Sequence, residues 1–271
     1  MARPTPAGRR TSPTASLALA VTSALAALAV VLGALTLASA PGSAARHTPG
    51  NAAEPQGRES TEPVGRAGTR RAPEGISHAT ESGGKAVNIT IDDGPDPTWT
   101  PRVLDVLASH GAKATFCMIG PQARAHPDLV KRVVAAGHRL CDHTVSHDTG
   151  MDHKPVAYQK KEILDAKRMI EDAAGGAEVH YYRAPGGAFT PESRKIAAAH
   201  GMRPLGWNVD TKDFDLPGEG RILETVRTEI GNGPTILFHD GGGDRSETVG
   251  ALGDTLAWLK DQGYGFSFPQ K

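Results

Sequence analysis

Residues 88–97 read NITIDDGPDP, a segment with the pattern of a buried strand that runs into a turn. A short β-branched run ends in two adjacent carboxylates, Asp92 and Asp93, and a Gly-Pro-Asp-Pro segment then breaks the strand. Successive residues at the end of a strand point in different directions. One carboxylate can therefore bind a metal ion while its neighbour faces a water molecule on that ion, and a bound cation would relieve their mutual repulsion.

Apolar strand-like segments and amphipathic helical segments alternate on both sides of this stretch. Such alternation predicts a parallel sheet with helical crossovers, and its length suits closure into a distorted (β/α) barrel of one catalytic domain over residues 85–271. The expected strands cover residues 86–91, 113–120, 138–144, 179–185, 204–210, 235–240 and 264–268. The expected helices cover residues 100–111, 126–138, 158–176, 190–201, 220–231 and 249–263.

The segment before this domain has a different composition. Residues 1–45 join an arginine-containing, acid-free start to a long uncharged apolar run, which predicts either a cleaved signal peptide or a membrane anchor, and so an exported protein. Residues 46–84 mix Pro, Gly, Ser and charges of both signs without apolar periodicity, so we expect a disordered linker there.

The charge balance argues against a nucleic-acid partner. The 271 residues include 30 Lys and Arg and 30 Asp and Glu, so no net field would draw the protein to polyanions. We expect the chain to act as a monomer.

Unusual polar residues follow the expected strands at their C-terminal ends. In (β/α) barrels this edge of the sheet is the active-site face. Independent segments therefore bring acids, bases and a cation to one rim: Asp92, Asp93, His143, Arg183, Asp210, His239 and Asp240.

Two of these segments predict a metal site. His143 and His147 are four residues apart in HTVSH, a spacing that lets two imidazoles face one way across a helical turn. With eleven histidines in the chain such a pair can also arise by chance, but a carboxylate from another strand end completes a recurrent catalytic metal set. Its nitrogen ligands favour Zn²⁺, or Co²⁺ or Ni²⁺, over Mg²⁺ or Ca²⁺.

The two cysteines fall on strands expected to be neighbours. Cys117 and Cys141 suit a disulfide in an exported protein. Two buried free thiols are the equal alternative, because a bridge between adjacent strands needs a particular Cβ geometry.

Five motifs together carry a family resemblance. TIDDGP, HTVSH, RAPGG, DTKDF and LFHD, in this order, resemble the motifs of the polysaccharide deacetylases, the NodB-homology domain of carbohydrate esterase family 4. The resemblance covers the chain from about residue 85 to its end. Each motif alone is a weak signal, but five in order at suitable strand ends are specific.

The resemblance implies a role for each matching residue. Asp92 corresponds to the catalytic base, held by Arg183, and His239 to the general acid, tuned by Asp213. The family's metal ligands fall on Asp93, His143 and His147, the oxyanion donor on the backbone near Gly186, and the acetyl-pocket leucine on Leu237. Phe214 stands where the family usually has tryptophan, which affects the wall of the substrate groove.

Together the residues and the resemblance predict a metal-dependent hydrolase that removes acetyl groups from peptidoglycan N-acetylglucosamine or chitin-type chains. The same residues could instead cleave an O-acetyl ester of acetylated xylan. A metal-free glycoside hydrolase using Asp92 and Asp213 as its acid and base is a different class, and a non-catalytic wall-binding module is another. Neither of these explains the histidine pair and Arg183 at once.

Overall fold

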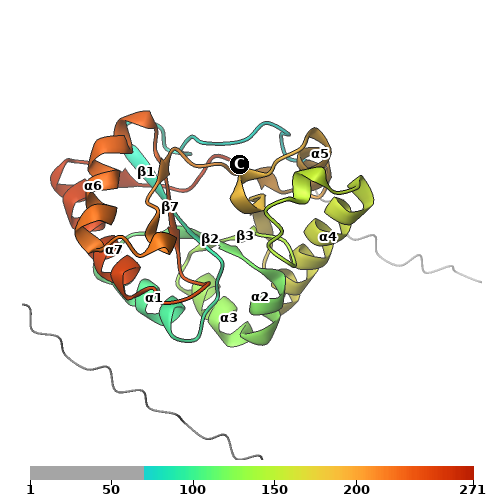
Figure 1. Cartoon of the computed structure of the whole chain (residues 1–271), viewed down its shortest axis with the longest axis horizontal. Coiled ribbons are helices and arrows are strands. Elements are labelled where there is room, and N and C mark those ends of the chain that lie inside the picture. Colours follow the sequence, from blue (N-terminus) through green and yellow to red (C-terminus); the bar gives the residue numbers. More distant parts are fainter. Residues whose placement is uncertain (1–69) are drawn as a thin grey trace, which may run out of the picture. The chain divides into compact units, whose positions relative to one another are not determined.

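A parallel sheet lies at the centre of the computed structural model, which describes residues 70–271 (Figure 1). The signal or anchor expected in residues 1–45, and the linker residues 46–69, lie outside the described residues. The strand order is β5-β4-β3-β2-β1-β7-β6, and β8 also pairs with β1. The strands are β1 (Ala86–Asp92), β2 (Ala114–Met118), β3 (Arg139–Asp142), β4 (Val179–Tyr182), β5 (Arg203–Pro204), β6 (Val209–Asp210), β7 (Thr235–His239) and β8 (Gly265–Phe266).

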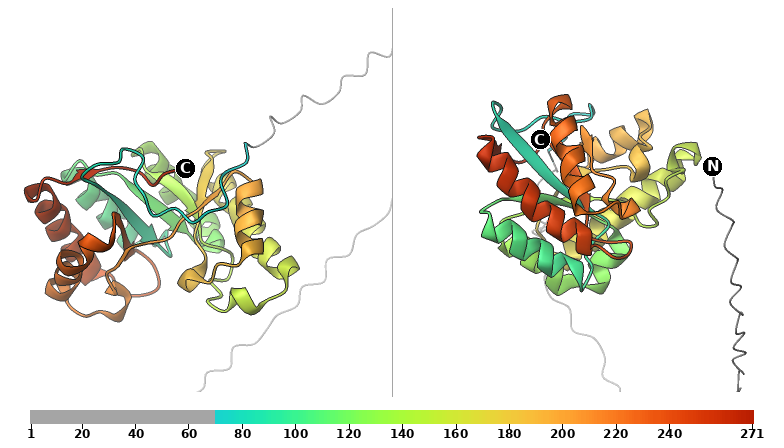
Figure 2. Two further views of the ribbon diagram at one scale, coloured as in Figure 1. Left: turned by 90° about the horizontal axis from the view of Figure 1, so that it is seen from above. Right: turned by 60° about the vertical axis from the view of Figure 1, so that its left-hand side comes forward.

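The helices lie around the outside of this sheet (Figures 1 and 2). They are α1 (Trp99–Ser109), α2 (Gly120–Ala125), α3 (Pro127–Ala135), α4 (Val156–Ala173), α5 (Pro191–Ala199), α6 (Glu219–Glu229) and α7 (Ser246–Asp261). The parallel α/β architecture predicted from the alternation is confirmed. Among the described helices, none combines the length and apolar character needed to cross a membrane.

Strand β1 shows how the sequence sorts side chains between the two faces of the sheet. Its odd-numbered residues, Val87, Ile89 and Ile91, are buried in the hydrophobic core. The polar side chains between them alternate with these, as the period of two requires, and they too are buried. Thr90 and Asp92 face the guanidinium of Arg183. The inner face of the sheet therefore carries polar side chains, while the outer face packs in the hydrophobic core.

The sheet is an open half-barrel. The expected strand over residues 204–210 is wrong in detail, because the structure has two short strands there, β5 and β6, which lie at opposite edges of the sheet. The intervening residues cross the opening. In the described part of the chain, β5 and β6 share no ladder, so the barrel is not closed by strand pairing.

Residues 70–84 correct the predicted boundary of the domain. Their composition predicts a disordered linker, but they pack along the domain beside the C-terminus (Figure 2). The backbone N–H of Ser77 donates to the carbonyl of Pro204, and that of Gly206 donates to the carbonyl of Ser77. Thr80 bridges to Pro269. The composition of this segment does not predict that it is ordered, because its order comes from backbone hydrogen bonds to residues far away in the sequence.

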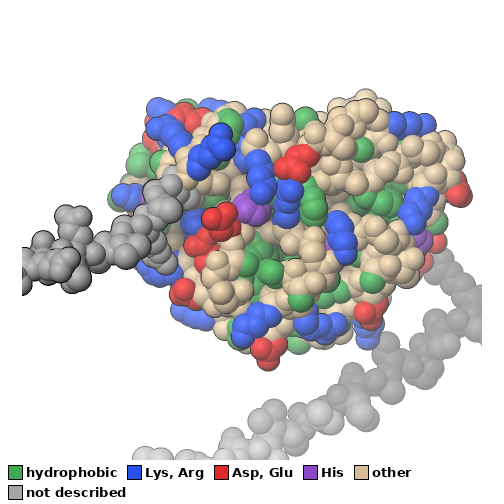
Figure 3. All heavy atoms as spheres, turned by 180° about the vertical axis from the view of Figure 1, so that it is seen from behind, with side chains coloured by type: hydrophobic (Ala, Val, Ile, Leu, Met, Phe, Trp, Pro, Cys, Tyr) green, Lys and Arg blue, Asp and Glu red, His purple; other side chains and the backbone are tan. Residues whose placement is uncertain are grey.

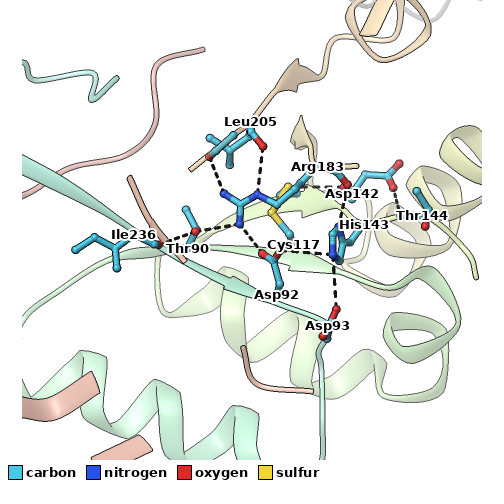
Figure 4. Close-up of a disulfide and its surroundings, with 12 residues drawn as sticks. Thr90, Asp92, Asp93, Cys117, Asp142, His143, Thr144, Arg183, Leu205 and Ile236 are labelled. Carbon is cyan, nitrogen blue, oxygen red and sulfur yellow. Dashed lines mark hydrogen bonds and ion pairs between the residues drawn. A yellow bond between two sulfur atoms is a disulfide. The ribbon is translucent and has the colours of Figure 1, made fainter. Parts of the chain in front are cut away.

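The disulfide alternative is the one observed. Cys117 of β2 and Cys141 of β3 lie opposite each other in the parallel register and form a disulfide. The bridge is fully buried and lies among the polar side chains drawn in Figure 4. It ties the strand beside Asp92 to the strand that leads into His143.

Candidate active site

The C-terminal ends of the strands bring the predicted residues to one edge of the sheet. Asp92 and His239 end β1 and β7, where they lie opposite each other in the register. His143 and Arg183 directly follow β3 and β4. A parallel sheet places the carboxyl ends of all its strands at the same edge, so residues 147 positions apart in sequence become neighbours.

Asp93, His143 and His147 form a candidate metal site. Their ligand atoms lie within 4.8 Å of one another. The Oδ1 atom of Asp93 lies 3.6 Å from Nε2 of His143 and 3.2 Å from Nε2 of His147, and this buried oxygen has no hydrogen-bond partner. One carboxylate oxygen and two imidazole nitrogens therefore converge on one point, and this donor set fits a zinc-type divalent cation.

The protonation state of His143 suits a ligand role. Its Nδ1 atom lies 2.8 Å from the carbonyl oxygen of Arg183, which places the ring proton on Nδ1 and leaves the Nε2 lone pair directed at the site (Figure 4). Burial lowers the pKa of His143 to about 3, so the ring is neutral at physiological pH. A neutral imidazole is the form that binds a metal ion.

His143 and His147 are brought together by an irregular loop and not by the helical turn that their spacing predicts. They do not lie on a helical turn, because the residues after β3 form an irregular loop. Thr144 and His147 have φ values of +68° and +53°, a left-handed conformation that non-glycine residues rarely adopt. Such strained backbone is concentrated at functional sites, where surrounding contacts hold it in place.

Asp92 is held by Arg183 inside the half-barrel (Figure 4). The Nη1 atom of Arg183 lies 2.6 Å from Oδ1 of Asp92, and neither residue is more than 2% exposed. The sequence predicts that a charge-assisted bond from Arg183 keeps Asp92 ionised. In the structure, burial raises the pKa of Asp92 by more than Arg183 lowers it, which makes this carboxylate a stronger base.

His239 and Asp213 form a second buried pair. The Nδ1 atom of His239 lies 2.7 Å from Oδ1 of Asp213, and the backbone N–H of His239 donates to Oδ2. Burial acts to lower the pKa of His239, but the hydrogen bond and charge of Asp213 outweigh it and raise that pKa. The ring is thus favoured in its protonated form, and within residues 70–271 its Nε2 atom makes no hydrogen bond.

A pocket of about 420 Å³ opens over these two pairs. Its volume falls in the range of small-molecule sites. Gly186, Phe214 and Leu237, the three residues expected to bind substrate, all line it. Gly186 has a φ of +59°, and Phe214 stands 41% exposed at the rim with its ring edge-on to His239.

Other residues of the site were not predicted. Thr211 and Thr248 donate to the carboxylate of Asp213, and Thr90 accepts from Arg183. Thr90 lies on β1, Thr248 on α7 and Thr211 directly after β6, and in sequence such buried threonines are indistinguishable from packing residues. Trp207, expected to be in the core or in a groove wall, lines the pocket, and Asp210 is paired with Lys212 at its rim.

Comparison with known proteins defines the class. The family model described as polysaccharide deacetylase matches residues 79–205, and the fold and the clustered motif residues agree with it. The chain belongs to the polysaccharide deacetylase family, hydrolases of N-acetyl amide bonds.

Particular relatives make the likeness more specific. The chain is 40% identical to a peptidoglycan-N-acetylglucosamine deacetylase of Bacillus cereus, covering 67% of this chain and 85% of the relative. It is 35% identical to a chitooligosaccharide deacetylase of Sinorhizobium fredii, over 68% and 89%. A solved structure of a Bacillus anthracis family 4 pseudoenzyme, BA3943, superposes with a TM-score of 0.62 at 30% identity, covering 67% of this chain and 63% of that one.

Proposed function

We propose that this protein is a metal-dependent deacetylase that removes acetyl groups from N-acetylglucosamine units of peptidoglycan. One observation carries the proposal. The unpartnered Oδ1 of Asp93 faces two imidazole nitrogens, and directly beside it lies the Asp92 carboxylate held by Arg183. A purely structural cluster would leave neither a buried oxygen without a partner nor a base next to it.

Asp93, His143 and His147 would hold the cation, with Zn²⁺ as the proposed occupant. When bound, a divalent cation supplies a Lewis acid that polarises the acetyl carbonyl and makes a nearby water more acidic. The neutral ring of His143 and the open side of the site toward the pocket support this assignment.

Asp92 takes the proton from the attacking water in this proposal. Its Oδ1 is occupied by Arg183, while Oδ2 lies 3.4 Å from Nε2 of His143 and so faces the metal site. The raised pKa strengthens it as a base. Arg183 orients the carboxylate through a charge-assisted hydrogen bond.

His239 gives a proton to the departing nitrogen. An amine leaves poorly as an anion, so a protonated imidazole on the strand next to Asp92, lining the same pocket, answers the main chemical difficulty of amide hydrolysis. Asp213 keeps the ring charged and correctly turned. The backbone near Gly186 is the proposed donor to the carbonyl oxygen, and Leu237 the proposed contact for the acetyl methyl group.

Peptidoglycan is the lead substrate because of the 40% identical relative, and chitin-type oligosaccharides are second because of the 35% identical one. Cleavage of acetyl esters in xylan is not favoured, because these two relatives are a peptidoglycan deacetylase and a chitooligosaccharide deacetylase. Exposed Phe214 replaces the expected tryptophan at the rim, so we propose that the aromatic contact to the sugar is kept while the indole N–H donor is lost.

The test is acetate release from three polymers by one preparation. Peptidoglycan, chitin oligosaccharides and acetylated xylan are each incubated with the parent protein and with an Asp92→Asn variant. Acetate from N-acetylated polymer that disappears in Asp92→Asn supports the proposal. Release from xylan alone would replace it with an esterase, and new reducing ends without acetate would indicate a glycoside hydrolase.

We also propose that the protein works outside the cytoplasm as a monomer without a nucleic-acid partner. A wall polymer is reached only after export, which agrees with the apolar run in residues 1–45. Basic and acidic side chains are interspersed on the face shown in Figure 3, which offers a polyanion no continuous positive surface there. Cell fractionation and light scattering test the location and the monomeric state.

A further inference from the structure

We infer that Glu162, on helix α4, is a positioning residue for the metal-binding loop. It is not one of the motif residues and does not line the pocket. Its carboxylate is nevertheless buried, with the residue only 8% exposed, and it lies under the loop that joins His143 to His147. The inference rests on the proposed function, because the loop matters only if Asp93 and the two histidines bind metal.

A single oxygen of Glu162 accepts three hydrogen bonds from this loop. The backbone N–H groups of Val145 and Ser146 donate to Oε2 at 3.1 and 2.8 Å, and the Ser146 hydroxyl donates at 2.9 Å. Two consecutive N–H groups aimed at one anion form a turn that encloses it. Charge-assisted bonds of this kind are stronger than neutral ones.

A second residue on the same face of α4 adds to the contact. Tyr158 precedes Glu162 by four residues, so the two side chains lie one above the other on the helix. The Tyr158 hydroxyl lies 3.2 Å from the Ser146 hydroxyl and donates to Asp148 at 3.2 Å. The loop is therefore tied to a long, regular helix on either side of His147.

These contacts stabilise a strained backbone in the loop. His147 and Thr144 have left-handed backbone conformations that cost free energy and persist only when neighbouring groups enforce them. Among the described residues, the only polar partner of the His147 ring is the Asp93 carboxylate, and the ring also lies edge-on to that of His143. Its position is thus set by the backbone between residues 144 and 147, and that backbone is anchored by Glu162.

The test measures zinc affinity directly. Metal-free parent protein and its variants are titrated with Zn²⁺ against a chromophoric chelator, and the unfolding temperature of each metal-free form is recorded separately. Glu162→Ala is expected to weaken zinc binding about 10–100-fold. Glu162→Gln keeps an acceptor oxygen and is expected to lose less than about tenfold.

Glu171→Ala is the matched control. Glu171 lies on the same helix, nine residues after Glu162, and accepts a backbone N–H from Val179 instead of from the histidine loop. Its removal is expected to lower the unfolding temperature without changing zinc affinity. Should Glu162→Ala not unfold cooperatively, Glu162→Asp takes its place, because the shorter carboxylate cannot reach both N–H groups; at least about tenfold weaker binding is expected.

Each outcome has a clear meaning. Zinc affinity within twofold of the parent in Glu162→Ala overturns the inference, and so does an equal loss in Glu171→Ala. A loss in Glu162→Gln as large as that in Glu162→Ala also overturns it. If the parent protein itself takes up no Zn²⁺, the proposed function fails first, and the role of Glu162 fails with it.

Discussion

Arg183 Nη1 lies 2.6 Å from Asp92 Oδ1, with both side chains shielded from solvent. The other nitrogens of the guanidinium are occupied as well, since Nε donates to the carbonyl of Leu205 and Nη2 to that of Gly206. Nη1 also donates to Thr90. The position of the proposed base therefore depends on β1, on β4 and on the segment that crosses the open side of the half-barrel.

Replacing Arg183 by lysine is expected to lower kcat/KM about 100-fold or more. A lysine ammonium is a point charge without the planar fork, so it cannot hold Asp92, Thr90 and two carbonyls together, and a misplaced base slows the reaction. Arg183→Met should also lower the free energy of unfolding by about 3–5 kcal/mol, because it leaves a buried carboxylate unpaired. Steady-state kinetics and urea unfolding measure the two effects. Arg168→Lys on the surface of α4 is the control, and parent-like kinetics in Arg183→Lys would refute the role.

Asp213→Asn is expected to shift the alkaline limb of the pH–kcat profile to lower pH. Burial lowers the pKa of His239, and Asp213 reverses this by stabilising the protonated ring. Without that charge the pKa falls, so the protonated acid is lost at a lower pH as pH rises. The loss of the acid's contribution should reach about 100-fold in kcat above that limb.

The matched variant is Asp215→Asn, an exposed acid two residues away. Its profile should overlay that of the parent. An alkaline limb that stays in place in Asp213→Asn would mean that His239 is not the proton donor.

Removing the metal is expected to abolish acetate release and to lower the unfolding temperature. A ligand that binds only the folded state stabilises it by about 4 kcal/mol at a thousandfold excess over its Kd. Dialysis against chelator, elemental analysis and refilling with Zn²⁺, Co²⁺ or Ni²⁺ make the measurement. The His147→Ala variant, treated in the same way, is expected to fold but to gain little stability from added zinc. Full activity after complete metal removal would contradict the mechanism.

Reducing the disulfide is expected to destabilise the domain by roughly 3–4 kcal/mol. Cys117 and Cys141 are 24 residues apart, and closing a loop of that length restricts the unfolded chain by about this amount. The unfolding temperature should fall by roughly 10 °C for a domain of this size. Calorimetry with and without reductant measures it, and a Cys117→Ala, Cys141→Ala protein should show no further response to reductant. An unchanged transition would show that the bridge adds no stability.

A chain that begins at Lys85 is expected to be less stable than one that begins at Arg70, by roughly 3–5 kcal/mol. The missing segment makes backbone hydrogen bonds to residues near 198, 205 and 269, each worth about 1 kcal/mol. Urea unfolding of the two forms tests this. Equal midpoints and slopes would restore the domain boundary predicted from composition.

The candidate site could be predicted from the sequence because its residues lie in short motifs at strand ends. Asp92, His143, Arg183 and His239 each follow an apolar run, and parallel topology alone gathers such positions at one edge. The contacts that hold them could not be predicted in this way. Glu162 and Thr248 have no motif, and they reach the site from helices whose sequences show only amphipathic packing.

The sequence by itself determined the parallel α/β architecture, the family and the residues that meet at the strand ends, because hydrophobic periodicity and strand-end chemistry are local properties. How these residues meet depends on the tertiary fold. It closed the Cys117–Cys141 bridge, placed residues 70–84 on the domain, and set the burial that raises the pKa of Asp92. These depend on desolvation and on hydrogen bonds between residues far apart in the chain, which no local pattern encodes.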